Sequence, residues 1–509
     1  MSIDVDPAGS DPLSSDSSGL AASKLRVQQI SSEEIAAHSL SFSDYNGRLF
    51  SWQGGLYRAI PADQSMLYRE LFEQGVVRSL IDKKLLVATA ITRLKLDPYE
   101  MVLRHHRIPV VSYPFEWCDA MFKAAALLHL DFCIALDRYD CTTDDAHPIN
   151  ILFEGCEPFF VDFGSINRLR KDLWYSWPWP PYEQFCRMFL YPLLLKASGQ
   201  KRLARWALHD FDRGVLKSDL DALIDRPWSM LRLAEAGARL TQASGQPLAD
   251  VAAGIRPWLR KGYRAAGRAM TKLSGIKSSR GEFLQQVRAE VAGISLRNDR
   301  ADGWLSTSVN LPENYVQVGE ILSELSPKSV LDMNIGGSRG AYARLAANCG
   351  ARVVAIDPKQ ENVSELYAIA RAGNLNILPL QMNFASPSDG LSNSFLASAH
   401  RRLNCDLVMA LSLDNEMVLK RGFDFVVKRL AVFASRWLLV EFVELPEPLL
   451  TTRWQERTID CPWYRLDNFV TALGRQFAQV DVLPIDSAVY PSERPAERPA
   501  NRRLLLCER

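Results

Sequence analysis

The sequence lacks an excess of either charge. It has 60 lysine and arginine residues against 59 aspartate and glutamate residues, so its formal net charge is only +1. A protein that binds bulk nucleic acid usually carries a basic excess. We therefore expect no bulk nucleic-acid binding.

A metal-binding cysteine pattern is also missing. The nine cysteines are scattered along the chain, no two of them have C-x-x-C spacing, and no histidine cluster accompanies them. This distribution argues against a zinc site or a disulfide framework and fits a reducing compartment. We expect no metal site. The cysteines are Cys118, Cys133, Cys141, Cys156, Cys186, Cys349, Cys405, Cys461 and Cys507.

Long apolar runs are absent as well. No stretch reaches the roughly 18 apolar residues that a transmembrane helix needs. The first residues lack the basic segment and apolar core of a signal peptide. Together these features predict a cytoplasmic protein without a membrane partner. Residues 1–24 are polar and poor in aromatics, so we expect them to form a disordered tail.

The chain contains two regions with different sequence patterns. Its 509 residues are enough for two or three domains. Residues 25–299 show hairpin-like strands, as at 47–52 and 56–60, and helical periodicity, as at 65–82 and 116–137. They predict an α+β domain.

From residue 300 to residue 509, short apolar runs alternate with amphipathic helical patterns. This rhythm predicts a mainly parallel sheet in a doubly wound α/β domain.

The most informative stretch of this second domain is VLDMNIGGSRGAYARLAANCGARVVAIDP. A predicted strand ends at Asp332, a turn holds Gly336, Gly337 and Gly340, and the next strand ends at Asp357. Glycines let a backbone approach a ligand closely and adopt positive φ angles, and the following helix N-terminus would lie beside that ligand. An acidic residue at the second strand tip can accept hydrogen bonds from ribose hydroxyls. The residues alone leave three alternatives: S-adenosylmethionine (SAM), a nicotinamide cofactor, or no ligand.

The same stretch resembles motifs I and II of class I SAM-dependent methyltransferases. Later segments resemble the third, fourth and fifth strands and the final antiparallel strand of that family. The resemblance covers residues 300–509 and implies a Rossmann-like, seven-stranded domain with SAM as its cofactor. Asn383 stands where the family has a polar residue beside the adenine. The implied cofactor-binding residues are Asp332, Gly336, Gly337, Gly340, Asp357, Asn383 and Leu411.

Two features depart from the family pattern or leave roles open. Asn334 occupies the position of the first motif glycine, and the turn before Gly340 is two residues longer than usual. Asp414, after the fourth strand, is either a catalytic acid that orients the acceptor or the N-cap of the next helix. Glu441 is either a strand-tip acid in the cleft or a surface residue. Both acids are candidates for a general base.

The first domain contains a kinase-like spacing. Asp145 and Asn150 are five residues apart, and Asp162 opens an Asp-Phe-Gly segment. These are the spacings of a kinase catalytic loop and its metal-binding aspartate. However, no histidine precedes Asp145 in the usual place, and the strand at 56–60 offers Arg58 and no lysine. We interpret residues 25–299 as a degenerate kinase-like domain.

The order of segments resembles a bacterial family of two-part proteins, some of them grouped with rhizobial nodulation proteins. The resemblance implies methyl transfer to a carbohydrate (glycan) or another small-molecule acceptor, which it does not identify. Two alternatives stay open: a small-molecule phosphotransferase that uses the kinase-like residues, and a non-catalytic protein in which both sites have decayed. No oligomeric state is predicted. The matching segments are Tyr113–Trp117, Asp145–Asn150, Phe160–Ser165 and Tyr182–Leu195.

Overall fold

The computed structural model describes residues 27–38, 46–169, 179–224, 279–296, 312, 314–387, 396–411, 415–444, 461–484 and 502–509. Its contacts divide the chain into two compact units. The first comprises Met1–Leu128, Ile149–Gly164 and Leu296–Arg509, and the second comprises His129–Pro148 and Ser165–Ser295. Within the described ranges, no helix combines the length and apolar character that crossing a membrane requires.

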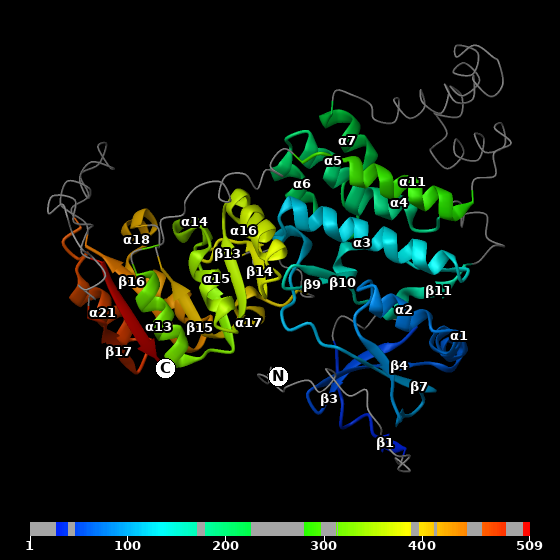
Figure 1. Cartoon of the computed structure of the whole chain (residues 1–509), viewed down its shortest axis with the longest axis horizontal. Helices are drawn as coiled ribbons and strands as arrows, with labels where there is room; N and C mark the ends of the chain where they lie inside the picture. Colours follow the sequence, from blue (N-terminus) through cyan, green and yellow to red (C-terminus); the bar gives the residue numbers. More distant parts are fainter. Residues whose placement is uncertain are drawn as a thin grey trace. The chain divides into compact units, whose positions relative to one another are not determined.

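The first unit begins with a five-stranded antiparallel sheet (Figure 1). The predicted hairpin is confirmed, because its two strands pair in register around a turn in which Gln53 and Gly54 both have positive φ angles. Two such residues in succession suit the right-handed twist of a hairpin. The sheet consists, in spatial order, of β2 (Ala36–Ala37), β3 (Arg48–Trp52), β4 (Gly55–Ile60), β7 (Met101–His105) and β5 (Thr89–Ile91).

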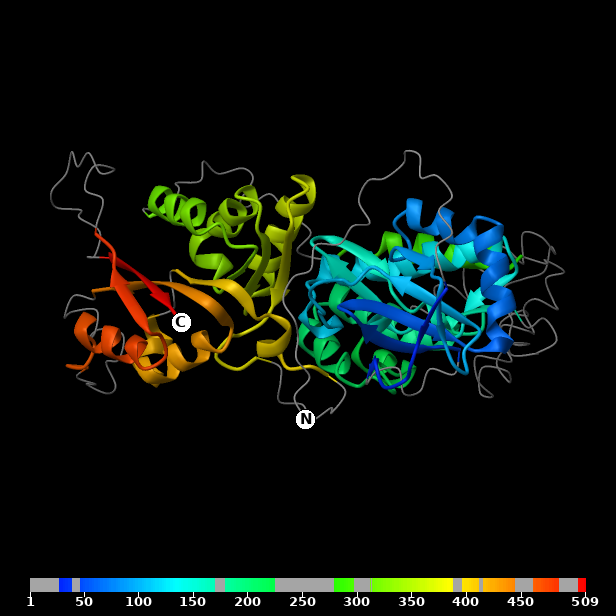
Figure 2. The same ribbon diagram turned by 90° about the horizontal axis from the view of Figure 1, so that it is seen from below.

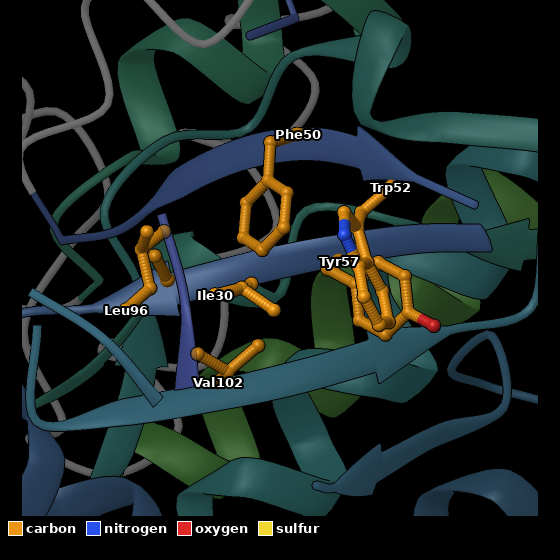
Figure 3. Packing of buried hydrophobic residues seen from close by; sticks show 7 residues of the cluster. Ile30, Phe50, Trp52, Tyr57, Leu96 and Val102 are labelled. Carbon is orange, nitrogen blue, oxygen red and sulfur yellow. The ribbon is translucent and has the colours of Figure 1, made fainter. Parts of the chain in front are cut away.

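Alternate side chains of these strands form a buried cluster on one face of the sheet. Figure 3 shows Phe50 and Trp52 of β3, Tyr57 of β4 and Val102 of β7 pointing toward one another. The period of two along a strand places Phe50 and Trp52 on the same face of the sheet. A parallel pair of short strands, β1 (Gln28–Ile30) and β6 (Leu94–Leu96), adds side chains to the same cluster.

Two helices and a second hairpin complete this part of the first unit. The helical pattern expected over 65–82 is divided into α1 (Ala62–Glu73) and α2 (Val76–Asp82), because Gly75 has a φ angle of 71° and ends the first helix. The second hairpin turns at Gly155 and consists of β9 (Ile151–Glu154) paired antiparallel with β10 (Glu157–Phe160).

The second unit is mainly helical. Its strands β8 (Cys141–Thr143) and β11 (Ile166–Arg168) pair antiparallel. Helix α3 (Asp119–Asp137) starts in the first unit and ends in the second, where Asp131 forms an ion pair with Arg288 of α11. The remaining helices are α4 (Tyr182–Phe185), a π-helical turn at Cys186–Leu190, α5 (Tyr191–Ala197), α6 (Lys201–Ala207), α7 (Lys217–Leu223) and α11 (Arg280–Gly293).

The C-terminal part of the first unit is built on a seven-stranded sheet, so the predicted α/β class is confirmed. The order in the sheet is β14-β13-β12-β15-β16-β18-β17. β18 runs antiparallel to both of its neighbours, β16 and β17, and the other neighbouring strands pair in parallel. The strands are β12 (Ser329–Asp332), β13 (Arg352–Asp357), β14 (Ile377–Gln381), β15 (Cys405–Ala410), β16 (Ala434–Val443), β17 (Gln479–Val482) and β18 (Arg502–Glu508).

Helices cover both faces of this sheet. Figure 2 shows α13, α15 and α16 on one face, in green to yellow, and α19 and α21 on the other, in orange. Double cover explains why the central strands are almost continuously apolar rather than alternating. The helices are α13 (Tyr315–Leu325), α14 (Ile335–Ser338), α15 (Ala341–Asn348), α16 (Gln360–Ala372), α17 (Ala399–Arg402), α18 (Asn415–Arg421), α19 (Phe423–Ala431) and α21 (Leu466–Gly474).

Candidate cofactor site

The candidate site lies at the point where the order of strands reverses. β12 has β13 on one side and β15 on the other, so the chain builds the sheet outward from β12 in two directions. In open α/β sheets, ligands bind beyond the carboxyl ends of the strands at such a point. The turn after β12, Asp357 at the end of β13 and Leu411 just after β15 share this edge.

Asp357 connects the second strand tip to the glycine turn. Its Oδ2 accepts the backbone N–H of Gly336 at 2.8 Å, and its Oδ1 accepts the backbone N–H of Lys359 at 2.8 Å. The carboxylate is almost fully buried, with 2% exposure. Each carboxylate oxygen has lone pairs beyond the one that its amide uses. Asp357 can therefore hold the turn and still accept hydrogen bonds from a ligand.

The glycine turn is partly helical, which the sequence does not predict. Residues Ile335–Ser338 form the short helix α14, because the two additional residues close a helical turn before Gly340. Gly340 has a φ angle of 67°, as the expectation of an unusual conformation requires. Gly336 and Gly337 instead lie in α14, where Gly337 is exposed.

Gly336 and Gly340 are also sterically constrained. A Cβ atom on Gly336 would lie 2.2 Å from Nδ2 of Asn362, and one on Gly340 would lie 2.8 Å from Cδ1 of Leu366. Both neighbours belong to α16. The turn therefore packs closely against side chains of this helix, and a larger residue at either position would have to displace them.

Asp332 is a fully buried acid at the end of β12. Its Oδ1 accepts a long hydrogen bond of 3.4 Å from the backbone N–H of Asn334. Its Oδ2 has no hydrogen-bond partner within the described part of the chain. Burial, and to a smaller extent the charge of Asp357, raises the pKa of Asp332 to about 7, although backbone N–H groups oppose the rise. A buried polar atom without a partner is costly, so a ligand that supplies one would be bound favourably.

The remaining predicted cofactor residues have simpler surroundings. Asn383 follows β14 and is exposed, and its Oδ1 accepts the backbone N–H of Ala385 at 3.0 Å, as in an Asx turn. Leu411 is buried, with 1% exposure, directly beyond β15. Both lie at the carboxyl ends of their strands, on the edge that carries Asp357.

Of the two predicted catalytic acids, only Glu441 can be located. It lies inside β16 and is 7% exposed, so the interpretation as a surface residue is wrong. Its Oε1 accepts Nδ2 of Asn314 at 2.8 Å, and its Oε2 pairs with Nη1 of Arg502 at 2.9 Å. Sequence reasoning did not predict these partners, which lie 127 and 61 residues away. Asp414 lies outside the described residues.

The kinase-like residues belong to different units. Asp145 lies in the second unit and is partly buried, whereas Asn150 and Asp162 lie in the first. Asp162 forms an ion pair with Arg58 of β4, in which Oδ1 and Nη2 are 3.2 Å apart and the arginine is 4% exposed. Asn150 is buried, and its carbonyl accepts the backbone N–H of Val161 at 2.9 Å. Among the residues that the structure describes, no group of three or more histidine, cysteine or acidic side chains could hold a metal ion.

Sequence reasoning missed two residues of α16 that form the support of the glycine turn. Asn362 and Leu366 lie under Gly336 and Gly340. Their spacing of four residues places them on one side of a helix. That spacing, directly after the acidic strand tip, is the signal that could have identified them.

No protein-family model matches the chain. Nodulation protein NoeA of Rhizobium meliloti (strain 1021) is 25% identical to it over 403 residues, which are 74% of this chain and 79% of NoeA. The predicted resemblance to nodulation-protein-like two-part proteins is thereby confirmed.

Solved structures of two other proteins show weaker similarity. Monomeric WbdD matches with 20% identity and a TM-score of 0.28, over 41% of this chain and 44% of its own. Another structure of WbdD names it a bifunctional kinase-methyltransferase. N-methyltransferase NodS from Bradyrhizobium japonicum WM9 matches with 13% identity and a TM-score of 0.26, over 38% of this chain and 94% of NodS. The chain thus spans less than half the length of WbdD.

Proposed function

We propose that this chain is a SAM-dependent methyltransferase whose cofactor site is formed by Asp332, Gly336, Gly340 and Asp357. The observation that carries the proposal is the 2.8 Å hydrogen bond by which Asp357 fixes the glycine turn at Gly336, while its other oxygen accepts the N–H of Lys359. It combines an acid for ribose hydroxyls with a turn that a ligand can approach closely. The site lies at the switch point of a seven-stranded sheet whose single antiparallel strand is β18, which supports a class I methyltransferase fold.

The charge of the site favours SAM over a nicotinamide cofactor. Asp332 and Asp357 are both buried, and a pyrophosphate would bring further negative charge toward them. SAM carries a sulfonium and an amino group instead of phosphates. A cationic ligand group near Oδ2 of Asp332 would compensate a carboxylate that burial otherwise destabilises.

The further site residues have roles that follow from their positions. Gly337 keeps α14 free of a side chain on its exposed side, Asn383 shapes the turn after the third strand, and Leu411 supplies an apolar wall. When bound, SAM supplies a methyl group that is already activated by its sulfonium. The protein then has to align the acceptor with that methyl group and exclude water, which is catalysis by proximity and orientation.

An acceptor hydroxyl or amine must also lose a proton. Glu441 already pairs with Asn314 and with the guanidinium of Arg502, although each of its oxygens keeps a further lone pair. We therefore propose Asp414 as the first candidate for the base and Glu441 as the second. The acceptor class that the two-part resemblance implies is a glycan or another small molecule.

We assign methyl transfer to a domain at residues 300–509 and treat residues 25–299 as a degenerate kinase-like domain. Arg58 supports this view, because its guanidinium already compensates the charge of Asp162. A carboxylate paired in this way is a poor additional ligand for Mg²⁺, which needs carboxylate charge and phosphate oxygens together. No described contact favours phosphotransfer.

Calorimetric titration of the full chain tests the proposal. We expect saturable binding of SAM and its demethylated product S-adenosylhomocysteine, and no binding of NAD. Titration with ATP and Mg²⁺ is the parallel experiment for the kinase-like half. Binding of NAD without SAM, or of neither, would overturn the methyltransferase assignment.

A further inference from the structure

Helix α16 lies between the glycine turn and residues of the first half of the chain. On one side, Asn362 and Leu366 contact Gly336 and Gly340. It also contacts residues before 160, which the sequence assigns to a different domain. These residues and α16 all belong to the first compact unit.

Three polar contacts join α16 to that earlier segment. Nε2 of Gln360 donates to Oδ2 of Asp119, the first residue of α3. The side chain of Ser364 interacts with the thiol of Cys118, whose pKa burial raises to about 11. The hydroxyl of Tyr367 donates to the carbonyl oxygen of Cys156 at 3.4 Å.

The spacing of these residues defines two sides of one helix. Positions 360, 364 and 367 follow the i, i+4, i+7 pattern of a single face. Asn362 is two positions from both 360 and 364, and two positions turn a helix by roughly 200°. The face that holds the earlier segment is therefore nearly opposite to the side that supports Gly336.

Of the three contacts, the one between Asp119 and Gln360 is nearest in sequence to Asp357. Asp119 is 3% and Gln360 is 8% exposed, so both side chains are largely shielded from water. Gln360 begins α16 only three residues after Asp357. A shift of Gln360 would move Lys359, whose N–H holds Oδ1 of Asp357, and Asn362, which supports Gly336.

We propose that Asp119 is a positioning residue for the cofactor turn and that the first half of the chain sets SAM affinity through α16. The inference deepens the proposed function and rests on it for the identity of the ligand. Asp119 contacts no cofactor. It acts by fixing Gln360, and through the start of α16 it holds Asp357 and Gly336 in the geometry that the ligand needs.

A second buried contact, between Arg402 and Glu116, also holds the earlier segment against the C-terminal part of the first unit. Arg402 of α17 donates from both terminal nitrogens to the carboxylate of Glu116, and its guanidinium lies 4.3 Å from the ring centroid of Tyr113. Arg402 is 6% and Glu116 is 0% exposed. Loss of one partner from such a pair is strongly destabilising, so this pair keeps the segment in place while Asp119 is varied.

Asp119→Ala is the first test, and hydrogen exchange in the full chain without ligand is the first readout. We expect faster exchange of the Gly336 amide, because its acceptor Asp357 is less firmly held. The SAM dissociation constant should rise roughly three- to thirtyfold, as for other residues that act along a coupled network. Tyr367→Phe is the matched control: it removes one hydrogen bond of the same face, two turns farther along, and should change neither quantity.

Substitutions at both Asp119 and Gln360 test whether SAM affinity can be lost and then restored at this contact. Gln360→Glu places two carboxylates together and should weaken SAM binding more than Asp119→Ala. Adding Asp119→Asn supplies an amide that donates to the new carboxylate, so the double variant should regain most of the affinity. Unchanged Gly336 exchange in Asp119→Ala, or a double variant as weak as Gln360→Glu, would overturn the inference. Failure of the unmodified chain to bind SAM would overturn the proposed function alone, because the exchange experiment needs no ligand.

Discussion

Two acidic motifs of this chain differ in what surrounds their carboxyl groups. At the end of β12 and β13, Asp332 and Asp357 receive hydrogen bonds from backbone N–H groups, and Oδ2 of Asp332 has no partner in the described ranges. In the kinase-like segment, Asp162 forms an ion pair with the buried guanidinium of Arg58. A sequence motif therefore shows which acidic residues lie near one another. The hydrogen-bond and ion-pair partners of these residues show whether their carboxylates are available to a ligand.

The difference predicts that substitutions at the sheet edge with Asp332 and Asp357 abolish or weaken ligand binding. Substitutions in the kinase-like segment should instead affect local stability. Arg58 stands on a strand about a hundred residues before Asp162 in sequence. The energetic consequence is that Asp162 is satisfied inside the protein, while the two acids of the sheet edge gain from a cationic or hydroxyl-bearing ligand.

The largest effect is expected for Gly340→Val. The side chain would need a positive φ angle, which β-branched residues avoid, and its Cβ would lie 2.8 Å from Leu366. We expect SAM binding to fall below calorimetric detection while thermal unfolding stays cooperative. Gly350→Val is the matched control, since Gly350 has a φ angle of 89° but a Cβ atom there would meet no other atom within 4 Å. Equal SAM affinity in both variants would show that the glycine turn is not part of the cofactor site.

Asp357→Ala should have the next largest effect. The variant loses the acceptor for ribose hydroxyls and the anchor of the Gly336 amide, so SAM affinity should fall by about 1.5–3 kcal/mol, the range for hydrogen bonds to a charged group. Titration calorimetry measures the change.

Asp406→Ala provides the comparison for this variant. Asp406 also accepts two backbone N–H groups, from Lys328 and Ser329, but at the opposite edge of the sheet. It should lose stability without losing SAM affinity. Unchanged affinity in Asp357→Ala would remove Asp357 from the site.

Much of the sheet edge that carries Asp332 and Asp357 could be predicted, because the sequence patterns that indicate it are local. The strands at 329–333 and 352–356 follow from apolar runs, and Asp332 and Asp357 from their positions at strand ends. The sequence does not reveal that the longer turn closes as helix α14, because a single helical turn leaves no periodicity. Nor does it reveal the partners of Glu441 and Asp162, because these partners come from segments far apart in sequence.

A third prediction concerns pH. The pKa of Asp332 is raised to about 7, mainly by burial, so below pH 7 the ligand-free protein carries a proton there. A cationic ligand group favours the ionised form, and binding must therefore release this proton. SAM affinity should rise roughly fivefold from pH 6 to pH 7, the change that a single group with this pKa produces.

The affinity of Asp332→Asn should be weaker and nearly independent of pH over the same interval. Calorimetry in two buffers with different ionisation enthalpies counts the released protons directly. The interpretation of Asp332 as the partner of a cationic group fails if the unmodified chain releases no proton on binding at pH 6.

The smallest effect on ligand binding is expected for Asp162→Asn, the counterpart of Asp357→Ala in the other motif. Asparagine keeps one oxygen for Arg58 but loses the charge, which should cost about 1–2 kcal/mol of unfolding free energy for this partly exposed pair. SAM affinity should stay within about twofold of the original value, since binding energies of distant, independent sites are additive. The full chain should hydrolyse no ATP before or after the substitution. ATP hydrolysis that the unmodified chain shows and Asp162→Asn loses would reverse the comparison, because Asp162 would then serve a nucleotide despite its ion pair, and phosphotransfer would become the leading function of the first half.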